Sequence, residues 1–142
     1  MKKFVTSALA LAACAYCAPA FGFGAIAVAE PASVAADGYS SGISYNFKTP
    51  VEAEDRAHRE CSTSQDAPPA TRQLCKVIRT FENQCVAVAL DPQNGTPGAG
   101  WAIAETLVLA RRDALRSCED TAGKDRQGEC RVTAEGCDGR AK

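Results

Sequence analysis

The stretch TPVEAEDRAHREC (Thr49–Cys61) returns later in the chain as TLVLARRDALRSC (Thr106–Cys118), and this repeat decides the fold. Each copy begins with threonine, carries two alanines four residues apart and ends in cysteine. Alanines at that spacing form one apolar stripe along a helix. In the first copy, Thr49 as N-cap, Pro50 at N1 and Glu52 in a capping box mark the helix start. We therefore expect two equivalent amphipathic helices.

The segments around the two helices also repeat. AIAVAEP at 25–31 matches VAVALDP at 86–92, and Cys75-Lys-Val matches Cys130-Arg-Val. Runs of small, β-branched or aromatic residues bounded by turn formers predict strands. The predicted strands are Gly24–Glu30, Gly42–Phe47, Leu74–Phe81, Cys85–Leu90, Gly100–Glu105 and Cys130–Cys137. The unit is therefore strand, strand, helix, strand, and the chain uses it twice.

The predicted fold class is α+β, with about six short, mostly antiparallel strands and two helices packed on the sheet faces. We expect a signal peptide over 1–20 and a single disulfide-stabilised domain over 21–142, made of repeats at about 23–82 and 83–138. Within the second strand, Ile43, Tyr45 and Phe47 alternate with polar residues and are expected on one face. Two polar stretches, Pro31–Ser41 and Ser62–Gln73, are expected to be irregular loops, and the tail from Asp138 to Lys142 is expected to be frayed.

The N-terminus has the three parts of a secretory signal peptide. Lys2 and Lys3 are basic, Phe4–Ala15 is apolar, and Ala18-Pro19-Ala20 is a cleavage site of the A-x-A type. The apolar run is shorter than the roughly 18 residues of a membrane span, which argues against an anchor. We expect a periplasmic or secreted protein with no integral membrane segment after signal cleavage.

A lipoprotein is the alternative, because Leu11–Cys14 resembles a bacterial lipobox. Cleavage before Cys14 would leave Cys17 as an unpaired extra, whereas cleavage after Ala20 leaves an even set of cysteines. Parity therefore favours the secretory signal, with a lipid anchor at Cys14 as the minor alternative.

The mature cysteines are expected to form disulfides. They are Cys61, Cys75, Cys85, Cys118, Cys130 and Cys137. Six cysteines allow fifteen pairings, and sequence alone does not choose among them. If both units fold alike, Cys61–Cys75 and Cys118–Cys130 are equivalent bridges, which leaves Cys85 and Cys137 to pair across the units. No closely spaced ligand pairs of a zinc site follow the leader, so we predict no metal ligands.

Charge and motifs narrow the function classes. The chain has 16 basic and 17 acidic residues, and two of the basic ones lie in the leader, so the mature net charge is −3. An acidic chain has no general attraction for phosphate backbones, which argues against nucleic-acid binding. G-x-S-x-G, Walker A and H-E-x-x-H motifs are absent. We predict no cofactor and no catalytic residue, and expect a non-enzymatic protein.

Three residues are candidates for function. His58, the one histidine, stands where the second copy has Leu115, so we interpret it as a residue at the edge of the core, with general base as the alternative. Trp101 and Tyr45, together with Phe47, could form an exposed aromatic patch, although core packing is the simpler interpretation. Glu30 and Asp91 hold equivalent repeat positions and would be the first carboxylate pair to inspect for glycosidase-like chemistry.

The chain resembles a family of small exported bacterial proteins known as domain of unknown function 4189, over roughly Phe23 to Cys137. The resemblance rests on the Gly-Ala-Ile-Ala run at Gly24, the helix pattern T-x-x-E-A-x-x-x-A-L-x-x-C, the two cysteines followed by a basic residue and Val, and Gly98-Ala-Gly-Trp101. The pattern's residues are Thr49, Glu52, Ala53, Ala57 and Cys61, then Thr106, Ala110, Ala114, Leu115 and Cys118. His58 and Leu109 depart from it, and the Cys61–Cys75 loop is long.

The resemblance implies an envelope or secreted protein and carries no established reaction. Some relatives are discussed as secreted factors of host-associated bacteria. The leading hypothesis is a module that binds a protein partner in the envelope or outside the cell. A periplasmic immunity protein against a toxin and a cell-wall hydrolase are the alternatives.

Overall fold

A computed structural model describes residues 22–142, so the expected signal peptide and the alternative lipid anchor at Cys14 lie outside the described residues. The elements in chain order are β1 (Phe23–Ala29), α1 (Val34–Asp37), β2 (Ser40–Phe47), α2 (Pro50–Thr63), α3 (Pro69–Arg72), β3 (Lys76–Glu82), β4 (Cys85–Leu90), β5 (Ala99–Ala104), α4 (Leu107–Ala122), η1 (Lys124–Arg126) and β6 (Arg131–Cys137). The short helices α1 and α3 lie in stretches that the sequence predicted as irregular.

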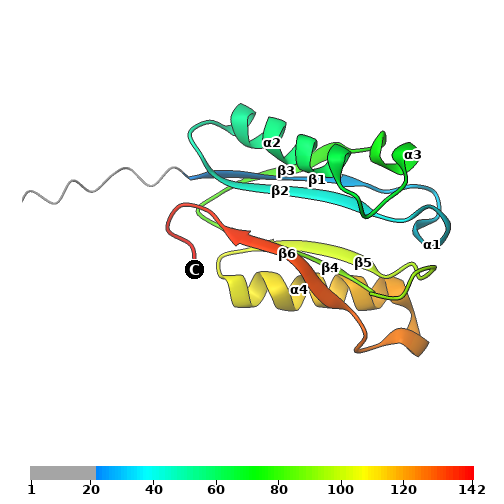
Figure 1. Cartoon of the computed structure of the whole chain (residues 1–142). Helices are drawn as coiled ribbons and strands as arrows, with labels where there is room; N and C mark the ends of the chain where they lie inside the picture. The colour runs from blue at the N-terminus through cyan, green and yellow to red at the C-terminus, as the bar shows by residue number, and fades with distance from the viewer. Residues whose placement is uncertain (1–21) are drawn as a thin grey trace, which may run out of the picture.

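The strands form two three-stranded antiparallel sheets, ordered β2-β1-β3 and β5-β4-β6. The molecule has four layers, in which α2 covers the first sheet, the two sheets face each other, and α4 covers the second (Figure 1). The duplicated strand-strand-helix-strand unit and the α+β class predicted from the sequence are confirmed. Each unit places its first strand at the centre of its own sheet.

Alternation of small and branched residues in the central strands explains the layering. In β1, Ala25, Ala27 and Ala29 pack against α2, and the intervening Ile26 and Val28 pack against the other sheet. In β4, Cys85, Ala87 and Ala89 face α4, while Val86 and Val88 lie between the sheets. Successive side chains of a strand point to opposite faces. One face therefore accepts a closely packed helix and the other fills the gap between sheets.

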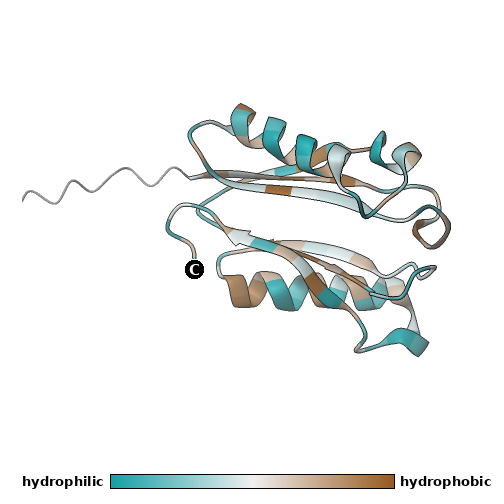
Figure 2. Ribbon diagram, viewed as in Figure 1, coloured by the Kyte–Doolittle hydropathy of each residue, from teal (hydrophilic) through white to brown (hydrophobic). Residues whose placement is uncertain are grey.

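The outer surface is mostly polar, whereas the inner strands carry the pale and brown colours of apolar residues (Figure 2). Apolar colour also marks the first turn of α4, where Val108 is 71% exposed. Both helices begin as predicted, because the hydroxyl of Thr49 accepts the Glu52 N–H and that of Thr106 accepts the Leu109 N–H. They continue beyond the cysteines that close the repeated stretch, to Thr63 and Ala122.

Two equivalent glycines let the helices lie almost on the strands. A Cβ at Gly42 would lie 2.2 Å from the carbonyl oxygen of Ala57, and one at Gly100 would lie 2.3 Å from the backbone nitrogen of Cys118. Real Cβ atoms do not come this close to other atoms. A side chain at either position would push its helix away from the sheet.

The disulfides are Cys61–Cys75, Cys118–Cys130 and Cys85–Cys137, the pairs expected from the duplication. The first two join each helix to the segment that leads into the unit's last strand. The third disulfide was expected to link the two units. It instead joins β4 to β6 inside the second sheet. The reason is that β4 and β6 are hydrogen-bonded neighbours, with Cys85 directly opposite Cys137.

The C-terminal tail is not frayed, contrary to the expectation. Asp138 is fully buried, and its carboxylate accepts the backbone N–H groups of Asn46 at 2.8 Å and Asn83 at 3.2 Å. The side-chain oxygens of these two asparagines accept N–H groups of Gly139 and Arg140 in return. Burial raises the pKa of Asp138, and the donated backbone hydrogen bonds act against that rise. The tail is therefore tied to β2 of the first unit and to the turn between β3 and β4.

The expected single face of β2 is also wrong. Ile43 packs between the sheets, but Phe47 packs on the α2 side. One extra residue in β2 shifts its register against β1 between Ala25 and Phe23, and Asn46 there has a φ of 63°. A bulge of this kind reverses the side on which the following residue points.

Candidate functional site

A groove of about 700 Å³ lies where the edge strands β2 and β6 of the two sheets meet. We call it the Tyr45 groove. It is lined by Ile43 and Tyr45 of β2, residues 132–135 of β6, Arg56 and Glu60 of α2, and Arg111 of α4. Both units therefore contribute walls.

Tyr45 is the exposed aromatic residue of this groove, with 42% of its surface accessible. Its ring lies close against β6 at Gly136, because a Cβ there would lie 2.2 Å from a ring carbon of Tyr45. The glycine thus leaves room for the ring, and the contact fixes its orientation. The phenol presents a rigid and partly apolar surface to solvent.

The charged walls of the Tyr45 groove are internally paired. Arg56 and Glu60 form an ion pair one turn apart on α2, at 2.5 Å. Arg111 donates both a side-chain Nε–H and an Nη–H to the carboxylate of Glu135, across from α4 to β6. The hydrogen bond and charge of Arg111 lower the pKa of Glu135. Both arginines that line the groove therefore already have carboxylate partners.

A second groove, of about 310 Å³, lies between the other pair of edge strands, β3 and β5. We call it the Trp101 groove. Arg79, Thr80, Gln84, Trp101 and Ile103 line it. In the duplicated chain, Trp101 and Ile103 follow Ile43 and Tyr45 by 58 positions, and residues 134 and 135 of the first groove follow 79 and 80 by 55. The two grooves are therefore equivalents related by the internal repeat.

The two aromatic candidates thus lie in different grooves and form no common patch. Trp101 is partly buried and packs on the core between the sheets, opposite Val88 of β4. Tyr45 is the more accessible of the two. Trp101 therefore packs mainly on the core between the sheets, whereas Tyr45 is exposed at the surface.

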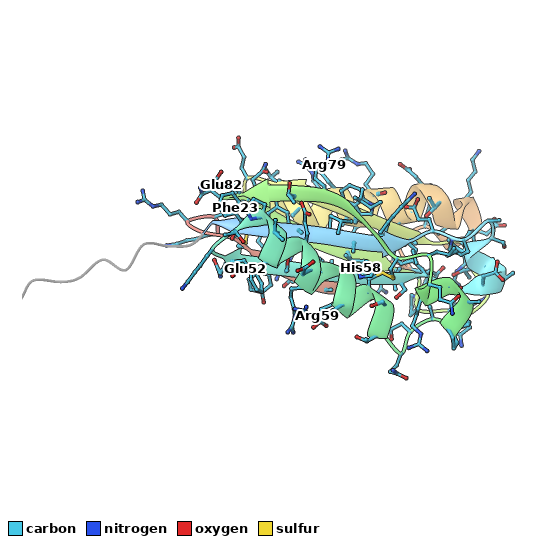
Figure 3. The ribbon with its side chains drawn as sticks, turned by 90° about the horizontal axis from the view of Figure 1, so that it is seen from above. Phe23, Glu52, His58, Arg59, Arg79 and Glu82 are labelled. Atoms are coloured by element: carbon cyan, nitrogen blue, oxygen red, sulfur yellow. A yellow bond between two sulfur atoms is a disulfide. The ribbon has the colours of Figure 1, made fainter. Side chains whose placement is uncertain are left out.

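His58 lies exposed on α2, the outermost layer seen from above in Figure 3. Its counterpart Leu115 packs against the core of the second unit, so the two positions differ in burial. His58 makes no hydrogen bond to a serine, threonine or cysteine within residues 22–142.

Glu30 and Asp91 follow β1 and β4 directly, but they have different surroundings. Glu30 is exposed, whereas the Asp91 side chain is inaccessible and accepts two hydrogen bonds from Arg126 at 2.8 and 2.7 Å. These bonds lower the pKa of Asp91 to about 2. A general acid needs a raised pKa. Asp91 is therefore a structural anion that holds η1 against the loop after β4.

Within residues 22–142, no group of three or more histidine, cysteine or carboxylate side chains is arranged to hold a metal ion. Over the same range, no helix combines the length and apolarity needed to cross a membrane. Three disulfides are typical of proteins that fold in an oxidising compartment outside the cytoplasm.

Some residues of the two grooves could not be named from the sequence. The Arg56–Glu60 pair has the i,i+4 spacing that a predicted helix makes readable. The Arg111–Glu135 pair joins residues 24 positions apart, and no local pattern indicates it. Arg79 is one basic residue in an edge strand, and only the repeat alignment with Ala134 draws attention to it.

Comparison with known proteins gives a family. No curated protein is significantly similar to the chain. Among solved structures, the NMR structure of Rv1813c from Mycobacterium tuberculosis is similar, with 18% identity and a TM-score of 0.46, over 96% of this chain and 94% of that one. The family model described as Domain of unknown function (DUF4189) matches residues 23–137. The chain is a member of the DUF4189 family.

Proposed function

We propose that this chain is an exported, non-enzymatic protein-binding module that holds its partner in the Tyr45 groove. The observation that carries the proposal is the accessible ring of Tyr45, fixed against Gly136 between arginines that already have carboxylate partners. Tyrosine and arginine are enriched among the residues that contribute most to protein interfaces. A rigid aromatic side chain also loses little conformational entropy on binding.

Export is supported by the sequence of the leader and by the three disulfides. The positive, apolar and small-residue segments of the N-terminus are those of a secretory signal. The partner is accordingly a protein of the envelope or the extracellular space. An immunity protein is the case in which that partner is a toxin, and the identity of the captured protein decides between the two.

Site-specific photo-crosslinking tests the proposal. The oxidised mature chain carrying benzoylphenylalanine at Tyr45 is incubated with an envelope fraction and irradiated, and the products are identified by mass spectrometry. The control carries the same group at Val108, which is 71% exposed on α4. We expect one stoichiometric partner from position 45 and none from position 108. Equal labelling from both positions would count against the groove.

Alanine variants then measure the contribution of the ring. Tyr45→Ala should weaken partner binding by about ten-fold or more, since loss of a central aromatic contact exceeds roughly 1.4 kcal/mol. His58→Ala is the matched control, because His58 is exposed on α2 and does not line the groove. Absence of any partner together with turnover of muropeptides would instead support the hydrolase hypothesis.

A further inference from the structure

The Trp101 groove contains an arginine without a carboxylate. Arg79 is opposite Ile26 in the pairing of β3 with β1, and Ile26 faces the other sheet. Directly paired residues of neighbouring strands share a face, so Arg79 is directed toward the gap between the sheets, at its open edge. Figure 3 shows β3, with Arg79 and Glu82, lying beside α2 and not beneath it. Among the described residues, Arg79 forms no ion pair and no side-chain hydrogen bond.

The Tyr45 groove, which is the equivalent of the Trp101 groove, shows that the fold does not require an unpaired arginine at this place. Both arginines of the Tyr45 groove are paired with carboxylates. The counterpart of Arg79 is Ala134, which packs on the core between the sheets. The counterpart of Glu135, which neutralises Arg111, is the uncharged Thr80. The Trp101 groove therefore has a cation where the fold accepts alanine, and lacks the acid that its equivalent possesses.

The remaining lining supplies an apolar surface and polar groups. Trp101 and Ile103 lie opposite Val88 and Val86, so their side chains also face the gap between the sheets. Gln84 adds an amide to the same hollow. Thr80 also lines it, but Thr80 pairs with Ala25, so its side chain lies on the α2 face of the sheet. A guanidinium beside an indole ring and hydrogen-bonding groups suits a carboxylate that carries an apolar neighbour.

We propose that the Trp101 groove is a second binding site, which takes an acidic segment of a protein partner. A carboxylate of that segment pairs with Arg79, and the adjacent apolar side chain covers Trp101. The mature chain is itself acidic, with a net charge of −3, so the attraction is local to Arg79. The site is separate from the Tyr45 groove and does not depend on the function proposed for it.

Trp101 is the only tryptophan of the chain, so its fluorescence reports on this groove alone. The oxidised mature protein is titrated with acetyl-Asp-Leu-Glu-Leu-amide, and separately with the uncharged acetyl-Asn-Leu-Gln-Leu-amide. We expect saturable quenching or a shift of the Trp101 emission with the acidic peptide, and binding of the uncharged peptide at least about ten-fold weaker. Added salt should weaken the binding of the acidic peptide but not that of the uncharged peptide, because the ion pair with Arg79 is partly exposed.

Two arginine variants assign the effect to the groove. Arg79→Ala should weaken the acidic peptide by about ten-fold. Arg59→Ala, which removes an exposed arginine of α2, should leave binding unchanged. Tyr45→Ala should also bind the acidic peptide normally, which separates this proposal from the function proposed above. Circular dichroism and intact mass confirm that each variant is folded with three disulfides.

Three results would overturn the proposal. The first is equal binding of the two peptides, and the second is an unchanged affinity in Arg79→Ala. The third is a Trp101 emission that does not change with the acidic peptide up to millimolar concentration but changes with protein concentration. That result would mean that the groove binds a second copy of the chain.

Discussion

Gly100→Ala should be among the most destabilising single-methyl changes in this protein. The added Cβ would lie 2.3 Å from the backbone nitrogen of Cys118 and 2.7 Å from the carbonyl carbon of Ser117. Ordinary contacts begin at 3.4 Å, so α4 has to move away from β5 by about 1 Å. The obstacle is helix backbone, which cannot rotate aside as a side chain would.

The loss of stability in Gly100→Ala can be estimated from the packing contacts of α4 that this displacement weakens. α4 packs on the sheet through Ala110, Ala114, Cys118 and Ala122. A radial gap of 0.5–1 Å forfeits about a quarter to a half of each dispersion contact. Overpacking typically costs about 1–3 kcal/mol, and a clash with rigid backbone belongs at the upper end. We expect a loss of about 3 kcal/mol, a large part of the roughly 5–15 kcal/mol of a typical domain.

Urea unfolding of the oxidised protein, followed by circular dichroism, measures this loss. The midpoint should fall at an unchanged m-value. Gly42→Ala is the equivalent change in the first unit and should cost a similar amount. Gly22→Ala is the control, since its Cβ would meet nothing closer than 3.4 Å. A Gly100→Ala protein within about 0.5 kcal/mol of the wild type would refute the close packing of helix on strand.

Three further predictions concern the bridges and the buried acids. Replacing both Cys85 and Cys137 with serine removes the disulfide that closes a loop of 52 residues, and the chain-entropy model predicts that this lowers the free energy of unfolding by about 4 kcal/mol. Urea unfolding measures the loss. A smaller loss than that from removing the Cys118–Cys130 disulfide, which closes a loop of 12 residues, would contradict the model. Asp91→Asn weakens the ion pair with Arg126. Because the folded pKa of Asp91 is lowered to about 2 from 3.8, the pair's contribution is present above pH 3.8 and lost as the pH falls toward 2, so the wild-type and variant stabilities should converge in acid. Asp138→Ala removes the carboxylate that accepts the part-buried backbone N–H groups of Asn46 and Asn83, at a cost of about 1–3 kcal/mol in total, and faster hydrogen exchange at those two amides checks it.

The duplication made most of the fold predictable. Equivalent helices after a strand pair, each closed by a cysteine, indicate the unit before any contact is known. The repeat also reduced fifteen cysteine pairings to one consistent set, because Cys61–Cys75 and Cys118–Cys130 are the same bridge in two copies. What the pattern did not indicate is that the two sheets pack face to face. The signal for this is present in β1, where branched Ile26 and Val28 alternate with alanines.

The errors lie where a single residue changes the local rule. The left-handed conformation of Asn46 inserts a bulge in β2, and this moves Phe47 to the helix side. Asp138 follows the last strand directly, and the sequence alone suggests a solvated tail residue. Its partners are 92 and 55 residues away, so only the folded chain brings them together. Tyr45 could be named as a candidate from the sequence. The groove around it could not be predicted, because its lining residues are far apart in the chain.

The repeat also serves as an internal control for separating folding from function. Positions that the fold needs are the same in both units, as Gly42 and Gly100 are beneath their helices. His58 and Leu115 differ, but their burial differs too, so packing accounts for that exchange. Arg79 and Ala134 differ at one equivalent place on the gap between the sheets, and the alanine shows that an apolar residue satisfies the fold there. Packing therefore does not account for Arg79. It follows that Arg79→Ala should leave the free energy of unfolding unchanged or raise it, and loss of acidic-peptide binding in that variant would report on recognition alone.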